Sequence, residues 1–161
     1  MREPIPPRVR RSYICRIANH LEETKMSAST RQAQDIATVQ SGFEAIAVGD
    51  LPAFSAGFHA DATWNHRNDD QIGGVHAGTA AIVNFVTTTM QLTAGTMKPQ
   101  PTAFMADGEG HVVVLMHMTA SRPDGRTLDD RQVLVFEVRD GLINSVEQFV
   151  GNPTAVTEFW A

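Results

Sequence analysis

The residue best suited to acid–base chemistry is His66, which ends the segment Ala62-Thr63-Trp64-Asn65-His66. Its imidazole has an ordinary pKa near ~6.5 and can take or give a proton near neutral pH. A hydrogen-bonded packing role is the equally simple alternative. Arg131 is the second candidate, because a guanidinium stabilises negative charge that develops on a bound ligand. A salt bridge to a neighbouring carboxylate is the simpler interpretation of Arg131.

Other side chains nearby could complete a binding pocket. Asn68, Asp69 and Asp70 lie in the polar loop that follows, where a pocket mouth is one interpretation and ordinary turn chemistry is the simpler one. Trp64 can stack on a flat ligand, and Met116 and Met118 can form an adaptable wall. All three are also ordinary core residues.

The sequence carries no pattern for a metal or a cofactor. His59, His66 and His76 share one stretch but lack a short ligand spacing such as His-x-His. The single cysteine, Cys15, excludes an internal disulfide framework and a cysteine-built metal site. We therefore expect a site that works with side chains alone, without a metal or a cofactor.

Length and composition predict one globular domain. The chain has 161 residues, of which 42% are hydrophobic and 19% charged, and this balance is typical of folded domains of this size. The longest apolar run, Val112 to Met118, is too short to cross a membrane and contains His117. We expect a cytoplasmic protein with no membrane partner.

Charge is unevenly distributed along the chain, whose net charge is −5. Residues 1–26 contain six basic and three acidic residues, whereas the remainder contains seven basic and fifteen acidic residues. An acidic body offers no broad basic surface, so we expect no nucleic-acid partner. We interpret residues 1–26 as a basic extension, either flexible or the product of a start site upstream of Met26, and residues 27–161 as the folded domain.

Apolar spacing predicts three helices followed by a meander of strands. Ser29 or Thr30 caps the first helix, Asp50 caps a short second one, and a third opens at Thr79 after a strand over 62–66. Further strands are expected over Thr96–Ala106, His111–Ser121, Thr127–Arg139 and Leu142–Val150.

Two turn signals, Pro123-Asp124-Gly125 and Asp140-Gly141, predict how the last three strands pair. Two-residue hairpins at both turns place Met118 opposite Arg131 and Val133 opposite Gln148. One face of the sheet then carries Met116, Met118, Arg131 and Gln148, and we take this face as the pocket wall. The opposite face carries His117, Asp130, Gln132 and Glu147, which form the alternative site if the faces are exchanged.

Neither face is polar enough to be simply solvated. A sheet with helices on one face and apolar groups on the other usually buries that other face against a partner. We therefore expect a homodimer.

Four short motifs are shared with a known family: Val48-Gly49-Asp50, Trp64-x-His66, Gly74-x-His76-x-Gly78 and Val138-x-Asp140-Gly141-x-Ile143. With the order of elements, they make residues 31–161 resemble the SnoaL-like members of the nuclear transport factor 2-like superfamily. That superfamily includes polyketide cyclases, ketosteroid isomerases and limonene epoxide hydrolase. The resemblance implies an α+β fold of the cystatin-like roll type. In such a fold, a cone-shaped barrel of a curved, mainly antiparallel sheet packs on about three N-terminal helices around a hydrophobic pocket.

The resemblance also implies roles for individual residues. By analogy with epoxide hydrolase, Trp64 and His66 line the pocket, and Gln148 stands where such enzymes carry a catalytic aspartate. An amide does not exchange a proton near neutrality, so the usual acid–base partner is absent. We expect a cofactor-free isomerase or cyclase acting on a small hydrophobic carbonyl compound. In it His66 is the base, and Arg131 with Gln148 stabilises the oxyanion.

Two alternatives stay open. The first is a non-catalytic ligand-binding or dimerisation module on the same fold, which the amide of Gln148 favours. The second is an epoxide hydrolase-like activity, which requires two carboxylates beside an arginine.

Overall fold

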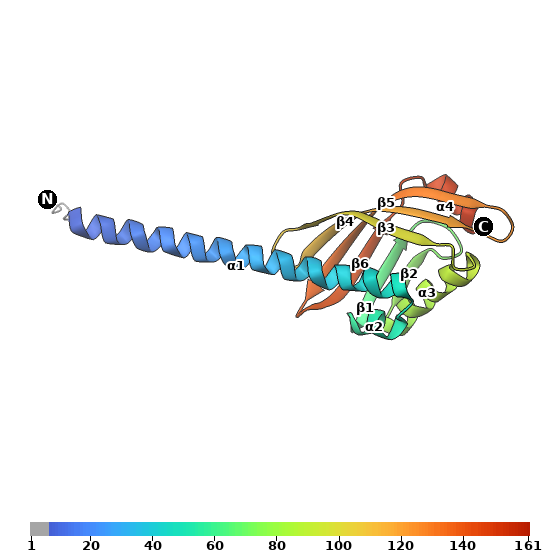
Figure 1. Cartoon of the computed structure of the whole chain (residues 1–161), viewed down its shortest axis with the longest axis horizontal. Helices are drawn as coiled ribbons and strands as arrows, with labels where there is room; N and C mark the ends of the chain where they lie inside the picture. Colours follow the sequence, from blue (N-terminus) through green and yellow to red (C-terminus); the bar gives the residue numbers. More distant parts are fainter. Residues whose placement is uncertain (1–6) are drawn as a thin grey trace.

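The computed structural model describes the backbone of residues 7–161 and the side chains of residues 27–161 (Figure 1). Its elements are α1 (Pro7–Val48), α2 (Leu51–Ala56), β1 (Phe58–Arg67), β2 (Gly74–Ala77), α3 (Thr79–Leu92), β3 (Lys98–Ala106), β4 (His111–Ser121), β5 (Thr127–Arg139), β6 (Leu142–Phe149) and α4 (Pro153–Trp160). The predicted bounds of β4 and β5 are confirmed. The short strand β2 and the helix α4 are additions that the sequence analysis did not predict.

Helix α1 begins earlier than predicted. It runs unbroken over 42 residues from Pro7, so a start at Ser29 or Thr30 is wrong. The physical reason is that residues 8–41 contain neither proline nor glycine, so nothing interrupts the helix between Pro7 and Ser29. The side chains of residues 1–26 lie outside the described part of the chain. The boundary between a basic extension and a folded domain therefore stays a prediction.

The second half of α1 crosses the sheet, and its first half extends beyond the body of the molecule (Figure 1). Despite its length α1 is not apolar enough to cross a membrane, and neither is any other helix among the described residues.

Six strands form one curved sheet in the order β2-β1-β6-β5-β4-β3. Neighbouring strands are antiparallel except for the parallel pair β1 and β6. The helices α1, α2 and α3 pack on the sheet, and α4 lies at one end of it (Figure 1). The predicted α+β class with a curved, mainly antiparallel sheet is confirmed. The sheet remains open, with β2 and β3 as its edges.

The pairing of β4 with β5 differs by one residue from the prediction. Met118 pairs with Asp130 and not with Arg131. The connecting turn is longer than a two-residue hairpin, because the main-chain N–H of Arg122 donates to the carbonyl of Arg126 at 2.8 Å and encloses three residues. The two-residue turn predicted at this position is therefore wrong, and every side chain of β5 exchanges faces.

The second turn has the predicted two-residue form. Asp140 and Gly141 both have positive φ, at 53° and 75°, as a type I′ turn requires. A β-bulge follows it and places Gln148 opposite Leu134 rather than Val133. As a result β4 and the end of β6 keep their predicted inward residues, and β5 is the strand whose faces are reversed.

The core lies between the sheet and the helices. Phe43 of α1 meets Phe104 of β3 and Phe136 of β5 edge-on, with ring centroids 6.1 Å apart in both pairs. At the other end of the molecule, Phe159 and Trp160 of α4 are buried. These two clusters leave a space between them, and the candidate site occupies it.

Candidate functional site

A mostly apolar cavity of about 50 Å³ lies between the sheet and the helices. The polar side chains in its wall include His66, Gln132 and Gln148, while the apolar part comes from several elements and includes Phe43 of α1, Phe85 of α3 and Trp160 of α4. A cavity that holds one water has a volume of about 10–15 Å³, so this cavity has room for about four water-sized groups. It suits a small ligand, and a larger one requires wall side chains to move.

Five of the predicted site residues line this cavity: Trp64, His66, Met116, Met118 and Gln148. All five are less than a tenth exposed. They share one wall because alternate residues of β1, β4 and β6 point to the same side of the sheet.

Arg131 does not line the cavity. The one-residue shift in β5 places it opposite His117 on the outer face, where it is exposed, so its predicted position in the pocket is wrong. The same shift divides the alternative cluster. Asp130 and Gln132 are buried on the inner face, whereas His117 and Glu147 lie on the outer face.

Asn68 and Asp69 stand behind the cavity wall rather than in it. The Asn68 amide donates to Asp70 Oδ2 at 2.6 Å and to Thr157 Oγ1 at 3.1 Å. Asp69 is exposed, and its main-chain carbonyl accepts a hydrogen bond of 3.3 Å from the Thr157 hydroxyl. Both residues therefore tie the loop after β1 to α4.

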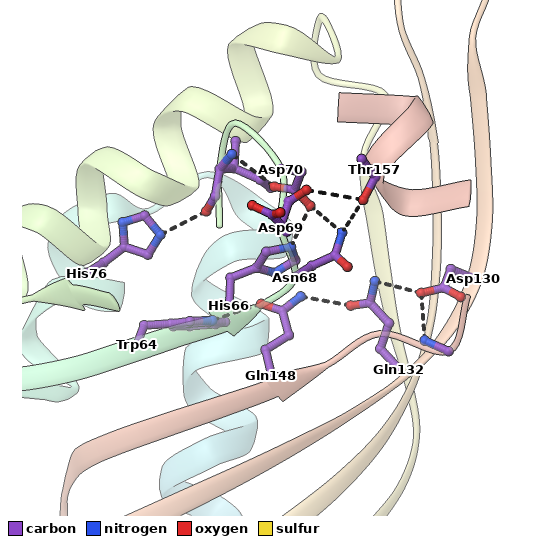
Figure 2. A network of polar contacts seen from close by, with 12 residues as sticks. Trp64, His66, Asn68, Asp69, Asp70, His76, Asp130, Gln132, Gln148 and Thr157 are labelled. Atoms are coloured by element: carbon purple, nitrogen blue, oxygen red, sulfur yellow. Dashed lines mark hydrogen bonds and ion pairs between the residues drawn. The ribbon is translucent and has the colours of Figure 1, made fainter. Parts of the chain in front are cut away.

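His66 forms a buried pair with Asp70 (Figure 2). The two side chains are 2% and 0% exposed, and His66 Nε2 lies 3.3 Å from Asp70 Oδ2. All the other partners of Asp70 are donors, including the main-chain N–H of Ile72 at 3.0 Å. A carboxylate accepts, so Nε2 carries the hydrogen, and in the neutral ring Nδ1 keeps its lone pair. Nδ1 is buried and has no hydrogen-bond partner in the described part of the chain.

A second set of buried polar groups, which we call the amide chain, crosses the sheet from β1 through β6 to β5 (Figure 2). Trp64 Nε1 donates to Gln148 Oε1 at 2.8 Å, and Gln148 Nε2 donates to Gln132 Oε1 at 2.8 Å. Gln132 Nε2 then donates to Asp130 Oδ2 at 3.1 Å. Two main-chain N–H groups just before α4 complete the partners of Asp130, at 3.0 and 3.2 Å.

Sequence reasoning did not assign three further residues their positions in this site. Asp70 was visible only as one acid of a polar loop, four residues after His66. Gln132 was assigned to the wrong face by the shift in β5. Trp160 belongs to α4, whose start carries a usable signal: the Asn152 side chain caps the helix through Ala155 N–H at 3.1 Å, and a proline follows in the first turn.

Among the residues whose side chains are described, no lysine, arginine, aspartate or glutamate lines the cavity. Its nearest buried charges are the carboxylates of Asp70 and Asp130, which stand behind His66 and Gln132. Across the residues whose side chains are described, no three or more histidine, cysteine or acidic residues are grouped to hold a metal ion.

Residues 39–146 match the SnoaL-like domain. The chain belongs to the SnoaL-like domain family. It is also 28% identical over 127 residues to an uncharacterized protein of Mycobacterium tuberculosis, in a match that covers 79% of this chain and 96% of that protein. The family resemblance drawn from the motifs is thereby confirmed.

Solved structures support the same fold. Bal32a, from a soil-derived mobile gene cassette, matches with a TM-score of 0.78 and 27% identity, covering 81% of this chain and 99% of its own. TerC, co-crystallized with polyporic acid, matches with a TM-score of 0.69 and 23% identity, covering 78% of this chain and 97% of its own. Further matches are described as NTF2-like or as having a cystatin-like fold.

Proposed function

We propose that the cavity binds a small, uncharged carbonyl compound and that His66 moves a proton on it, as a cofactor-free isomerase or cyclase of the SnoaL-like family. The observation that carries the proposal is the state of the His66 ring. Asp70 holds Nε2, and the buried Nδ1 has no hydrogen-bond partner among the described residues. A histidine with one nitrogen anchored to a carboxylate and the other free beside a cavity is arranged as a general base.

In the proposed step, Nδ1 takes a proton from the carbon next to the carbonyl. The electron pair of that C–H bond forms the carbon–carbon double bond of the enolate, and the π pair of the carbonyl moves onto its oxygen. The carboxylate of Asp70 then stabilises the charged imidazolium. Nδ1 returns the proton to another atom of the enolate, so the reaction is an isomerisation, or a cyclisation where the enolate carbon first attacks a second carbonyl of the same molecule.

The oxyanion in this proposal lies against an amide rather than a guanidinium. Gln148 is in the cavity wall, whereas Arg131 is on the outer face. The Nε2 group of Gln148 has two hydrogens and uses one of them on Gln132. Its second hydrogen is the donor that we assign to the ligand oxygen.

Deuterium exchange into small ketones tests the proposal. Acetophenone or cyclohex-2-enone is incubated with the protein in D₂O, and loss of the α-proton signal is followed by NMR. We expect His66→Gln to lower the exchange rate by about 10²- to 10⁴-fold, the usual contribution of a general base. His117→Gln is the matched control, because its His–Asp pair lies on the outer face. Equal rates for the native protein and His66→Gln would end the assignment.

A non-catalytic ligand-binding module is the second candidate function. Two observations favour it: the small free volume of the cavity, about 50 Å³, and the absence of a carboxylate from its wall among the described side chains. TerC, which shares the fold, has been co-crystallized with polyporic acid, and we extend to this chain the idea that the fold holds a small molecule. Ketone binding that survives His66→Gln, with no exchange in either protein, would favour this candidate.

The site gives no support to an epoxide hydrolase-like activity. That chemistry requires carboxylates beside an arginine, and the cavity wall carries glutamines at 132 and 148. We also propose a cytoplasmic location, on the basis of composition alone.

A further inference from the structure

Both ends of the amide chain fix its direction. Trp64 has only a donor to offer, so the atom of Gln148 that faces it must be the oxygen. Asp130 has only acceptors, so the atom of Gln132 that faces it must be the nitrogen. Between these ends Gln148 donates to Gln132 at 2.8 Å. Reversing either amide would bring two donors or two acceptors together.

Asp130 is held as an acceptor by every partner it has in the described part of the chain. It receives Gln132 Nε2 and the main-chain N–H groups of Gly151 and Asn152, and it is 4% exposed. Buried polar groups with no alternative partner hold their neighbours in one orientation. A residue that does not line the cavity thereby decides, together with Trp64 at the other end, which atoms of two cavity residues are nitrogen.

We propose that Asp130 is a positioning residue: it orients Gln132 and Gln148 so that both present amide N–H groups to the cavity, which then selects a ligand with an uncharged acceptor oxygen. The ligand half of this inference rests on the proposed function. Each amide nitrogen has a second hydrogen beyond the one used in the chain, and both residues line the cavity.

The charges around the cavity explain why we assign an uncharged acceptor oxygen to the ligand. A carboxylate ligand would enter an apolar cavity whose described wall side chains include no lysine or arginine. The buried carboxylates of Asp70 and Asp130 lie behind two of the wall residues. Like charges repel strongly where water is excluded. A ketone or aldehyde meets the same N–H donors without this repulsion.

A double-mutant cycle tests the positioning role without any ligand. Asp130→Asn adds a donor at one end of the amide chain, and Gln148→Glu adds an acceptor near the other end. Each change alone forces one like-with-like contact. Together they allow Gln132 to turn over, donating to position 148 and accepting from position 130. We therefore expect the double variant to unfold at a higher temperature than the sum of the two single losses predicts.

Additive losses in the double variant would contradict the positioning role. If both single variants fail to fold, a folded double variant still demonstrates the coupling, and a double variant that also fails to fold contradicts it. Asp129→Asn is the matched control, because Asp129 is the adjacent acid on the outer face, bound to His117 at 2.7 Å. Combined with Gln148→Glu, it is expected to give an additive result.

Ligand preference is a readout that a purely structural role would not move. The probes are acetophenone, an uncharged ketone, and benzoate, an anion of similar size, with binding measured by ligand-observed NMR. We expect the native protein to prefer acetophenone, and Asp130→Asn to shift the affinity ratio towards benzoate by about tenfold. An unchanged ratio, or no binding of either probe to the native protein, would overturn the ligand half.

The double-mutant cycle tests the positioning role of Asp130, and the deuterium-exchange experiment tests proton transfer by His66. Either proposal can fail without the other. Coupling between positions 130 and 148 needs no turnover, so it survives if His66 moves no proton. Conversely, ketone exchange that depends on His66 with additive stability effects at 130 and 148 would leave the proposed function standing and remove Asp130 from it.

Discussion

One carboxylate decides which nitrogen of His66 is free. Asp70 accepts from His66 Nε2 and Asn68 Nδ2 on one oxygen and from Ile72 N–H on the other. Asp70→Asn places an NH₂ group among these donors, and His66 can then relieve the conflict by taking its other tautomer. In that tautomer Nδ1 carries the hydrogen and is no longer a base.

We therefore expect Asp70→Asn to lower ketone deuterium exchange by about 10²- to 10⁴-fold and the free energy of unfolding by about 1–3 kcal/mol. Urea denaturation measures the second effect. Asp61→Asn is the control, because Asp61 is an exposed acid on β1, the strand that carries His66. An Asp70→Asn variant with native exchange kinetics would show that the pair is not used.

A second acid–histidine pair, Asp107 and His111, makes a pH prediction. Burial alone would raise the pKa of Asp107. Hydrogen bonds from the main-chain N–H of Glu109 and from His111 outweigh this effect and lower the pKa to about 2. The hydrogen bond and negative charge of Asp107 raise the pKa of His111 above its ordinary 6.5. The stabilisation by His111 is therefore complete below pH 6.5 and is lost as the pH rises through its folded pKa. The stabilisation by Asp107 is present above pH 3.8 and is lost as the pH falls towards 2.

An NMR titration of the His111 ring measures this directly. We expect its pKa to lie above 6.5 in the native protein and to return towards that value in Asp107→Asn. Asp124→Asn, which changes an acid in a different turn, should leave the His111 titration as it is. Both side chains of the pair are largely exposed, so the effect on overall stability is expected to be small.

At the scale of elements, local signals predicted where strands and helices lie but not how they pair. Caps, turn residues and apolar spacing act within a few residues, and they gave the bounds of β4 and β5 and the cap of α2. The face of β5 depends on whether the turn before it encloses two or three residues, and Pro123-Asp124-Gly125 is compatible with both. That single residue decides whether Arg131 or Gln132 faces the cavity. Asp70 was equally hidden, because contacts with α4 fix the path of its loop.

The connection from β6 to α4 is close-packed, and glycine is required in it. A Cβ at Gly151 would lie 2.3 Å from the carbonyl oxygen of Arg131 and 3.0 Å from Asp130 Oδ1. Gly151→Ala must therefore move the start of α4 away from the Asp130 carboxylate, which accepts from the main-chain N–H groups of Gly151 and Asn152. We expect a loss of about 1–3 kcal/mol in the free energy of unfolding. Gly42→Ala is the opposite control. It lies inside α1 with nothing within 4 Å of a new Cβ, and it should stabilise by about 0.5–1 kcal/mol. Equal effects in denaturation would contradict this account.

At the scale of the whole molecule, the outer face of the sheet carries exposed apolar side chains in the described part of the chain. Leu115 and Phe149 are 40% and 43% exposed, and Met105 on β3 is 48% exposed. Charges of both signs lie on the same face, including Arg131 and Glu147. A second copy of the chain offers the same apolar groups and charges of both signs, which are the features that a two-fold interface between identical faces requires.

We propose that this face forms a homodimer, and we expect the native chain to sediment as a dimer. Leu115→Lys places a charge in the middle of the face and should shift the protein to the monomer. It should leave the cavity unchanged, because Leu115 points away from it while Met116 points into it. Val48→Lys is the matched control, since Val48 is 80% exposed at the end of α1 and should still give a dimer. A native protein that sediments as a monomer at micromolar concentration would show that these exposed apolar side chains do not bind a second copy.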